Sequence, residues 1–262
     1  MTRNTSRYRG RLAQFTYRAD VKVAWEERWQ AADLRKAYEL ADKGALGVYR
    51  RSFLKYLPRD GLIIEAGCGT GRYVRALVRY GYKVVGIEWE YNIIERAKCV
   101  WPDAPLLCGD VRRFPFPEQS AAAVISLGVI EHFEEPWQIL EDTVRVLQAG
   151  GLLYLVTPYV SHLRRLRAAW GKYPERTSGR DFYQYLLADE EISAALSKMG
   201  FVVKTSFSTS AFAGLNDEFP RLGNLVKKLP QAHRLINGLN RLHLLGPWCG
   251  HVVHYIAEKR WG

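Results

Sequence analysis

A short run of glycines preceded by an acid is the first place in this 262-residue sequence where residue types and spacing point to chemistry. The segment 63–71 reads Ile-Ile-Glu-Ala-Gly-Cys-Gly-Thr-Gly, an apolar stretch that leads into Gly67, Gly69 and Gly71, with Cys68 between them. Glycines here let backbone N–H groups approach a ligand closely, beside a helix N-terminus that favours negative charge. The segment therefore predicts a ligand-binding turn between a strand and a helix.

The spacing and the acid restrict the choice of ligand. A dinucleotide fingerprint reads G-x-G-x-x-G, whereas this run reads G-x-G-x-G with Arg72 in the sixth place. Glu65, two residues before the first glycine, would repel a pyrophosphate but suits the ammonium group of an amino acid. A nicotinamide-dependent oxidoreductase is therefore disfavoured.

A second acid, Glu88, ends the next apolar run at 84–87. Open α/β sheets bind ligands at the carboxyl ends of their strands, and an ionised carboxylate can accept hydrogen bonds from both hydroxyls of a ribose. Two acids beside one glycine turn therefore predict a site for a nucleoside joined to an amino acid.

These residues resemble the class I S-adenosylmethionine-dependent methyltransferases, closely over about residues 60–158 and loosely over 201–208. The resemblance implies S-adenosylmethionine as cofactor, with its methionine end at the glycine turn and its ribose on Glu88. It also implies an enzyme with an α/β fold, whose seven-stranded, mostly parallel sheet has the order 3-2-1-4-5-7-6 with helices on both faces.

The resemblance assigns further cofactor contacts. Trp89 would pack on the adenine, and Asp110 with Val111 would contact the edge of the adenine ring. The segment 126–133, which includes Leu127, would lie beside the methionine and the departing methyl group. Residues 147–152 resemble the family's L-x-P-G-G turn before strand five, with alanine where proline is commoner.

A general base assists methyl transfer to a hydroxyl or to a protonated amine, and histidine is the first candidate because its pKa lies near working pH. His132 follows the predicted fourth strand directly and is our candidate, with a role in shaping the pocket as the alternative. Glu131 and Tyr159 are weaker candidates. The other histidines considered are expected to be surface or core residues: His162, His251 and His254.

The elements that must position these residues alternate between strands and helices from residue 62 onward, as parallel strands with crossover helices do. Several strands are apolar at consecutive positions, which is typical of central strands covered on both faces. We expect one domain over 1–262. Its parts are an N-terminal helical lid at 1–57, a cofactor-binding core at 58–158, and acceptor-side insertions at 159–187 and 209–250.

The net charge of +11 is unevenly distributed. Residues 1–60 carry a net charge of +7, whereas residues 61–158 carry −3, so the basic excess lies in the flanks. These flanks are also aromatic and partly amphipathic, which favours a small-molecule or lipid-like acceptor with an anionic part. Solvated arginine-rich helix faces are the plainer explanation.

Two other functions remain open. A tRNA or rRNA methyltransferase is compatible with the charge, although no appended RNA-binding module is visible. A non-catalytic cofactor-binding scaffold is the second alternative, but a scaffold has no need of both carboxylates.

Composition gives expectations about the environment. Four cysteines without metal-ligand spacing predict neither a zinc site nor a disulfide framework, and fit a cytoplasmic protein. No apolar run is long enough for a transmembrane helix, so we expect a soluble protein for which peripheral membrane contact stays open. The sequence leaves the oligomeric state undetermined.

Overall fold

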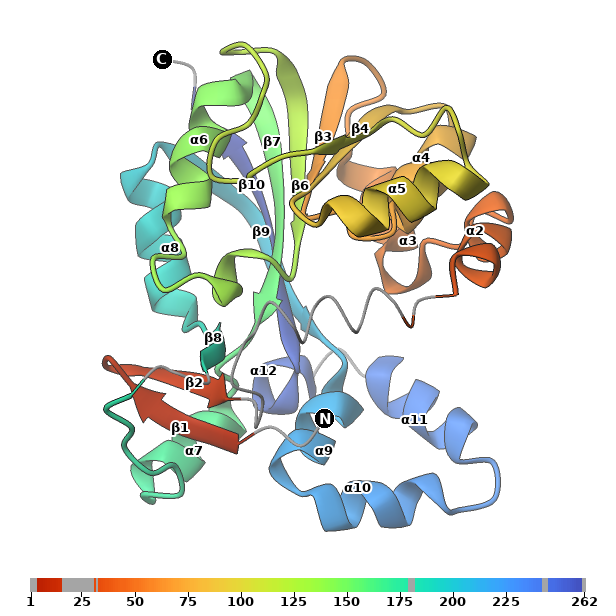
Figure 1. Ribbon diagram of the computed structural model, residues 1–262. Coiled ribbons are helices and arrows are strands. Elements are labelled where there is room, and N and C mark those ends of the chain that lie inside the picture. The colour runs from red at the N-terminus through yellow and green to blue at the C-terminus, as the bar shows by residue number, and fades with distance from the viewer. Residues whose placement is uncertain (1–3, 16–30, 32, 179–181, 242–244, 261–262) are drawn as a thin grey trace.

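The computed structural model describes residues 4–15, 31, 33–178, 182–241 and 245–260. Its centre is a seven-stranded sheet in the order β5-β4-β3-β6-β7-β10-β9 (Figure 1). This order confirms the predicted 3-2-1-4-5-7-6 arrangement. In chain order the strands are β3 (Leu62–Ala66), β4 (Lys83–Glu88), β5 (Leu106–Cys108), β6 (Ala121–Leu127), β7 (Leu147–Pro158), β9 (Phe201–Thr209) and β10 (Val252–Lys259).

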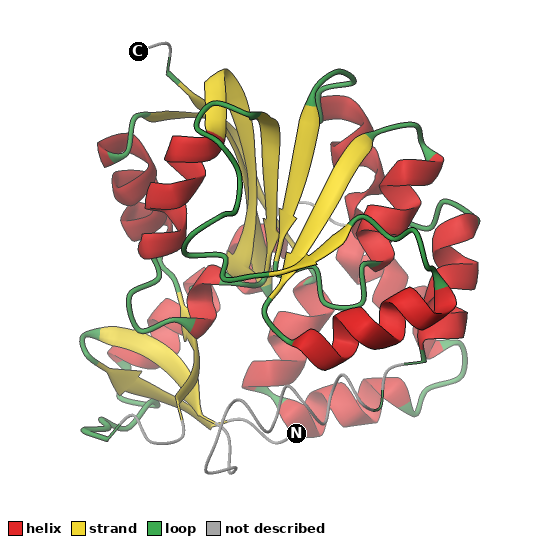
Figure 2. Cartoon of the chain, turned by 45° about the horizontal axis from the view of Figure 1, so that its top comes forward, coloured by secondary structure: helices red, strands yellow, loops and turns green. Residues whose placement is uncertain are grey.

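Consecutive apolar residues in the central strands point to opposite faces of the sheet, and both faces are covered. In β3, Ile63 belongs to the core beneath one helical layer and Ile64 to the core beneath the other, and both are fully buried. Val124 and Ile125 of β6 divide in the same way. The sequence pattern therefore correctly indicated a sheet between two layers of helices, which Figure 2 shows.

One layer of helices contains α2 to α5 and the other contains α6 and α8. Glycine-rich or polar turns end most of these helices, and their apolar sides face the sheet. The bounds of the helices are α2 (Leu34–Asp42), η1 (Gly47–Tyr49), α3 (Arg50–Tyr56), α4 (Arg72–Arg79), α5 (Tyr91–Val100), η2 (Ile130–His132), α6 (Gln138–Val146), α7 (His162–Ala169), α8 (Asp189–Lys198), α9 (Ala211–Glu218), α10 (Pro220–Lys227), α11 (Ala232–Arg241) and α12 (Gly246–Cys249).

The sheet is mixed because β10 runs antiparallel to both of its neighbours, β7 and β9. The glycine segment 147–152 was predicted to be a turn before strand five, but it lies within β7 as an irregularity. The register with β6 passes from Ala121 opposite Leu147 to Ala123 opposite Leu152, so extra residues of β7 bulge out there. Gly150, with a φ of 72°, supplies the backbone conformation that this bulge needs.

The prediction of a helical segment over all of 1–57 is wrong for residues 4–15, which form two strands. β1 (Asn4–Tyr8) and β2 (Arg11–Phe15) make a hairpin, and β2 pairs with β8 (Phe182–Leu186) in a separate three-stranded sheet. Arg9 and Gly10 both have positive φ, which matches the twist of a two-residue hairpin turn. Residues 34–42 and 47–56 are helical as expected, and 16–30 lie outside the described residues.

The hairpin, α7 and the helices α9 to α12 form a lobe beyond the carboxyl ends of the parallel strands (Figure 1). A buried ion cluster holds α7 to α9 in this lobe. Arg164, whose side chain is 1% exposed, contacts Asp217 at 2.9 Å and Glu218 at 3.0 Å, and donates to the carbonyl of Tyr159 at 2.6 Å. Tyr173 also donates to Glu218. Part of the positive charge of segment 159–187 is therefore neutralised inside the protein.

Candidate active site

The glycine turn lies between β3 and α4 and is closely packed. Gly67 and Gly71 have φ values of 65° and 70°. A Cβ on Gly67 would lie 2.6 Å from a methyl group of Val129, and one on Gly71 would lie 2.8 Å from Leu106. Glycine is therefore required at both positions by backbone conformation and by space.

Glu88 ends β4, next to this turn, and its carboxylate is fixed by the backbone. Oε2 accepts the Gly69 N–H at 2.9 Å, and Oε1 accepts the N–H groups of Trp89 and Glu90 at 3.0 and 3.2 Å. Burial raises the pKa of Glu88, although these three donors act in the opposite direction. A carboxylate has about four acceptor directions, so the orientation is fixed while at least one direction is left for a ligand.

Glu65, near the end of β3, is in a different situation. Its side chain is buried, and its Oε2 has no hydrogen-bond partner among the described residues. Burial raises its pKa to about 8, against the opposing influence of the Val74 backbone and the Arg72 guanidinium. A buried acceptor without a donor is costly in free energy, so this oxygen is suited to a cationic donor from a ligand.

Two residues beside Glu65 were not among the predicted site residues. Arg72, the first residue of α4, has a buried Nε without a hydrogen-bond partner among the described residues, and its Nη2 donates to Tyr73 at 2.9 Å. Tyr49 of η1 packs edge-on against Tyr73, and its pKa is raised by burial and by nearby groups that include Glu65. Arg72 could have been identified from its position directly after the glycine run, whereas no local pattern indicated Tyr49.

The residues predicted to contact the adenine lie around the ends of β4 and β5. The backbone N–H of Gly109 donates to the carbonyl of Glu88, which holds Asp110 next to the β4 tip. Both carboxylate oxygens of Asp110 pair with Arg112, at 2.6 to 3.0 Å, and this pairing lowers the pKa of Asp110. Val111 is buried, and Trp89 is 52% exposed, as an aromatic plate open to a ligand would be.

Two further predicted cofactor contacts, Cys68 and Leu127, lie in the glycine turn and at the end of β6. The Cys68 thiol is buried against Gly86, and burial raises the pKa of this thiol well above the usual range. The backbone N–H of Cys68 donates to the carbonyl of Ile87. Leu127 ends β6 and is partly buried. The structure thus brings the glycine turn, Glu65 and Glu88 together, with Leu127 at the adjacent strand end.

His132 lies in η2, directly after the carboxyl end of β6. Its Nδ1 is 2.7 Å from the carbonyl oxygen of Tyr183 in β8, and the two rings pack edge-on at 4.9 Å. A carbonyl can only accept a hydrogen bond, so in the neutral imidazole Nδ1 carries the proton and Nε2 has the lone pair. This is the tautomer that a base acting through Nε2 needs.

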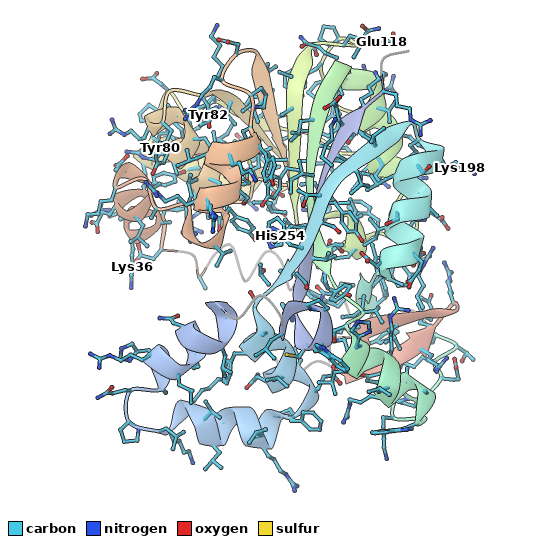
Figure 3. The ribbon with its side chains drawn as sticks, turned by 180° about the vertical axis from the view of Figure 1, so that it is seen from behind. Lys36, Tyr80, Tyr82, Glu118, Lys198 and His254 are labelled. Carbon is cyan, nitrogen blue, oxygen red and sulfur yellow. The ribbon has the colours of Figure 1, made fainter. Side chains whose placement is uncertain are left out.

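The weaker candidates and the remaining histidines lie elsewhere. Glu131 is buried beside Gly128, and Tyr159 follows β7 with its pKa raised by burial. His162 is exposed on α7, and His251 contacts Asp217 in the buried ion cluster. His254 is fully buried on the sheet (Figure 3), between Tyr154 and Thr209, and burial lowers its pKa to about 4. His254 is therefore a core residue.

These residues fit S-adenosylmethionine. The buried Glu65 Oε2 and the buried Arg72 Nε provide an acceptor and a donor of opposite charge, which match the ammonium and the carboxylate of an amino acid. Glu88 and the exposed Trp89 at the neighbouring strand end match a ribose and an adenine ring.

Comparison with known proteins agrees with this fit. A family model described as "methyltransferase domain" matches residues 64–155. A "probable S-adenosylmethionine-dependent methyltransferase" of Mycolicibacterium smegmatis is 26% identical over 179 residues, which are 68% of this chain and 66% of that protein. A malonyl-[acyl-carrier protein] O-methyltransferase of Hamiltonella defensa is 24% identical over 64% of this chain and 60% of its own length.

The solved structures agree on the fold. A SAM-dependent methyltransferase from Archaeoglobus fulgidus superposes with a TM-score of 0.57 and 15% identity, covering 92% of this chain and all of that one. The chain spans about half to two thirds of the length of the curated relatives. Residues 64–155 of this chain, which include the glycine turn, therefore belong to the methyltransferase-domain family, and the mixed seven-stranded sheet is the fold of the class I S-adenosylmethionine-dependent methyltransferases.

Proposed function

We propose that this protein transfers a methyl group from S-adenosylmethionine to an oxygen or nitrogen nucleophile of a small or lipid-like acceptor with an anionic part. The observation that carries the proposal is the pair of buried acids at neighbouring strand ends. Glu88 is already oriented by three N–H donors, while one oxygen of Glu65 has no donor within the described part of the chain. The malonyl-[acyl-carrier protein] O-methyltransferase among the relatives supports an oxygen of an anionic acyl group as one such nucleophile.

The chain's own residues have distinct roles in this proposal. Glu65 and Arg72 would bind the amino-acid end of the cofactor, Glu88 its ribose, and Trp89 the face of its adenine. Asp110 and Val111 would contact the adenine edge once the carboxylate of Asp110 turns from Arg112. When bound, S-adenosylmethionine supplies an activated methyl group. The protein then has to align the acceptor with that methyl group and to exclude water.

His132 would remove the proton of the acceptor. The Tyr183 carbonyl holds Nδ1–H, so Nε2 is the nitrogen that accepts a proton, and the resulting imidazolium keeps its hydrogen bond to Tyr183. Tyr183 belongs to β8, so the three-stranded sheet supports the base. A basic surface on the lobe would favour the anionic part of the acceptor.

Calorimetric titration with S-adenosylhomocysteine, the demethylated product, tests the cofactor site. We expect the wild-type protein to bind, and Glu88→Gln to weaken binding roughly 10- to 100-fold, because it removes a charge-assisted hydrogen bond to the ribose. The matched control is Glu95→Gln, an exposed acid on α5 just beyond the same strand, which should bind as the wild type does. Absence of binding by the wild type, or unchanged binding by Glu88→Gln, would contradict the proposal.

A further inference from the structure

The stretch from Phe219 to Arg241 contains α10 and α11, and we call it the helical arm. It has five Lys or Arg residues and no Asp or Glu, although the chain as a whole has 27 acids. The arm packs against α9 and lies in the lobe beyond the carboxyl ends of the parallel strands (Figures 1 and 3). Its charge is therefore a local property of one surface and is not balanced by acids within the arm.

The arm also exposes large apolar side chains. Leu222 and Leu225 are 54% and 61% exposed, and Leu229 and Leu235 are each 46% exposed. Leu222 and Leu225 are spaced by three residues in α10, which places them on one side of this helix, and Leu229 follows just beyond its end. Solvent exposure of this many leucines is unfavourable in water, so this side of the helical arm is suited to an apolar environment.

The opposite side of α10 is occupied by the protein. Gly223 is buried, and a Cβ at this position would lie 2.2 Å from the side-chain oxygen of Asn216 in α9. Lys227 donates to the same oxygen at 2.9 Å. Because this side is held against α9, the leucine side faces outward as a fixed feature of the fold.

Basic residues flank the leucines. At 100° per residue, Arg221 and Lys228 fall on the same edge of the leucine side, and both are exposed. An amphipathic helix with an apolar strip and a basic edge is suited to the interface of an anionic bilayer, where leucines enter the acyl boundary and cations meet the headgroups.

We propose that the helical arm docks this protein on anionic lipid bilayers. A nucleic acid would use the cations but leave the leucines in water, whereas a bilayer surface satisfies both. None of the described helices is long and apolar enough to cross a bilayer, and the proposal concerns adsorption of the arm at the bilayer surface. This docking does not depend on methyl transfer. Together with the proposed function, it would bring the carboxyl edge of the sheet toward acceptors held in the membrane.

Vesicle co-sedimentation of the full chain tests the proposal. We expect binding to phosphatidylcholine vesicles that contain phosphatidylglycerol, and much weaker binding to phosphatidylcholine alone or at high salt. Leu222→Gln with Leu225→Gln should reduce partitioning about tenfold or more, because two apolar side chains no longer enter the interface. Arg221→Gln with Lys228→Gln should reduce partitioning to the anionic vesicles by roughly tenfold and should make this partitioning less dependent on salt.

The matched control is Val100→Gln with Leu107→Gln, two exposed apolar positions on α5 and on β5 at the other edge of the sheet, which should sediment as the wild type does. Circular dichroism and binding of S-adenosylhomocysteine should be unchanged in all three double variants, which separates this test from that of the cofactor site. The proposal is overturned if the wild type does not sediment with anionic vesicles, or if the leucine variant sediments as the wild type does. Binding of tRNA that depends on the cations but not on the leucines, without vesicle binding, would overturn it in favour of a nucleic-acid surface.

Discussion

The two buried carboxyl groups beside the glycine turn differ in the hydrogen bonds that they accept. Glu88 has three backbone donors and is oriented before any ligand arrives. Burial disfavours the charged form of Glu65, and one of its carboxyl oxygens has no donor among the described residues. A ligand that brings a positive charge to Glu65 relieves that cost, so part of the binding free energy arises from an unfavourable feature of the ligand-free site.

The hydrogen bond from His132 to the Tyr183 carbonyl leads to a kinetic prediction. His132→Gln should lower kcat by about 100-fold or more with an acceptor that must lose a proton, because the side chain that accepts this proton is gone. Binding of S-adenosylhomocysteine should be unchanged, since our proposal has His132 contact the acceptor and not the cofactor. Release of S-adenosylhomocysteine during turnover measures kcat, and calorimetry measures the binding.

His162→Gln is the matched control, because His162 is an exposed histidine on α7 outside the proposed machinery. It should keep wild-type turnover. Near-normal kcat in His132→Gln would show that His132 only shapes the pocket, which is the alternative that the sequence left open.

At the scale of elements, local patterns predicted the core well and the lobe poorly. Strands such as β3 and β6 were recognisable because consecutive apolar residues need cover on both faces, and these faces are buried. The strands β1 and β2 were missed because β2 is stabilised by β8, about 170 residues further along the chain. The turn at Arg9 and Gly10 was the one local signal for this hairpin.

The candidate site shows the same division. Glu65, Glu88 and the glycine turn could be proposed from the sequence because their spacing carries chemical meaning within one strand-turn-helix-strand unit. Tyr49 reaches the site only because η1 and α3 pack over the sheet, where Tyr49 contacts Phe53 and Tyr154. No spacing within residues 47–56 indicates that contact, so it could not be predicted.

Because of the ion cluster that joins α7 to α9, we expect substitutions of two neighbouring arginines to change the free energy of unfolding by very different amounts. Arg164→Met should lower the free energy of unfolding by about 3–5 kcal/mol, because it leaves Asp217 and Glu218 without their buried partner. Arg165→Met is the control: Arg165 pairs with Glu190 in an exposed pair, and its loss should cost at most about 1 kcal/mol. Denaturant titration followed by tryptophan fluorescence measures both, and equal losses would contradict a structural role for the cluster.

For the whole molecule, the raised pKa of Glu65 links stability to pH. The pKa is about 8 in the folded protein and 4.5 in an ordinary glutamate, so the folded state retains a proton that the unfolded state has released. The stability contributed by the neutral carboxyl is fully present below pH 4.5 and is lost as the pH rises through 8.

Glu65→Gln should therefore stabilise the cofactor-free protein at alkaline pH, on the order of 3 kcal/mol, and leave it nearly unchanged near pH 4.5. The same change should reduce the gain in stability on adding S-adenosylhomocysteine, because the amide oxygen can accept a hydrogen bond from the ammonium group but carries no charge to pair with it. Unfolding curves at both pH values, with Glu95→Gln as control, measure the effect. A loss of stability that is the same at both pH values would contradict this account.

The pairing of β2 with β8 has a consequence for biosynthesis. The side chain of Gln184 in β8 donates a hydrogen bond to that of Gln14 in β2. The hairpin is synthesised first, but β8 becomes available for pairing only after some two thirds of the polypeptide has been made. Tyr183, which orients His132, belongs to that late strand. A nascent chain halted before residue 182 would already contain the glycine turn and both acids, but it would lack the Tyr183 carbonyl that accepts from His132 Nδ1. The ability to catalyse methyl transfer should therefore be acquired later in translation than the ability to bind the cofactor.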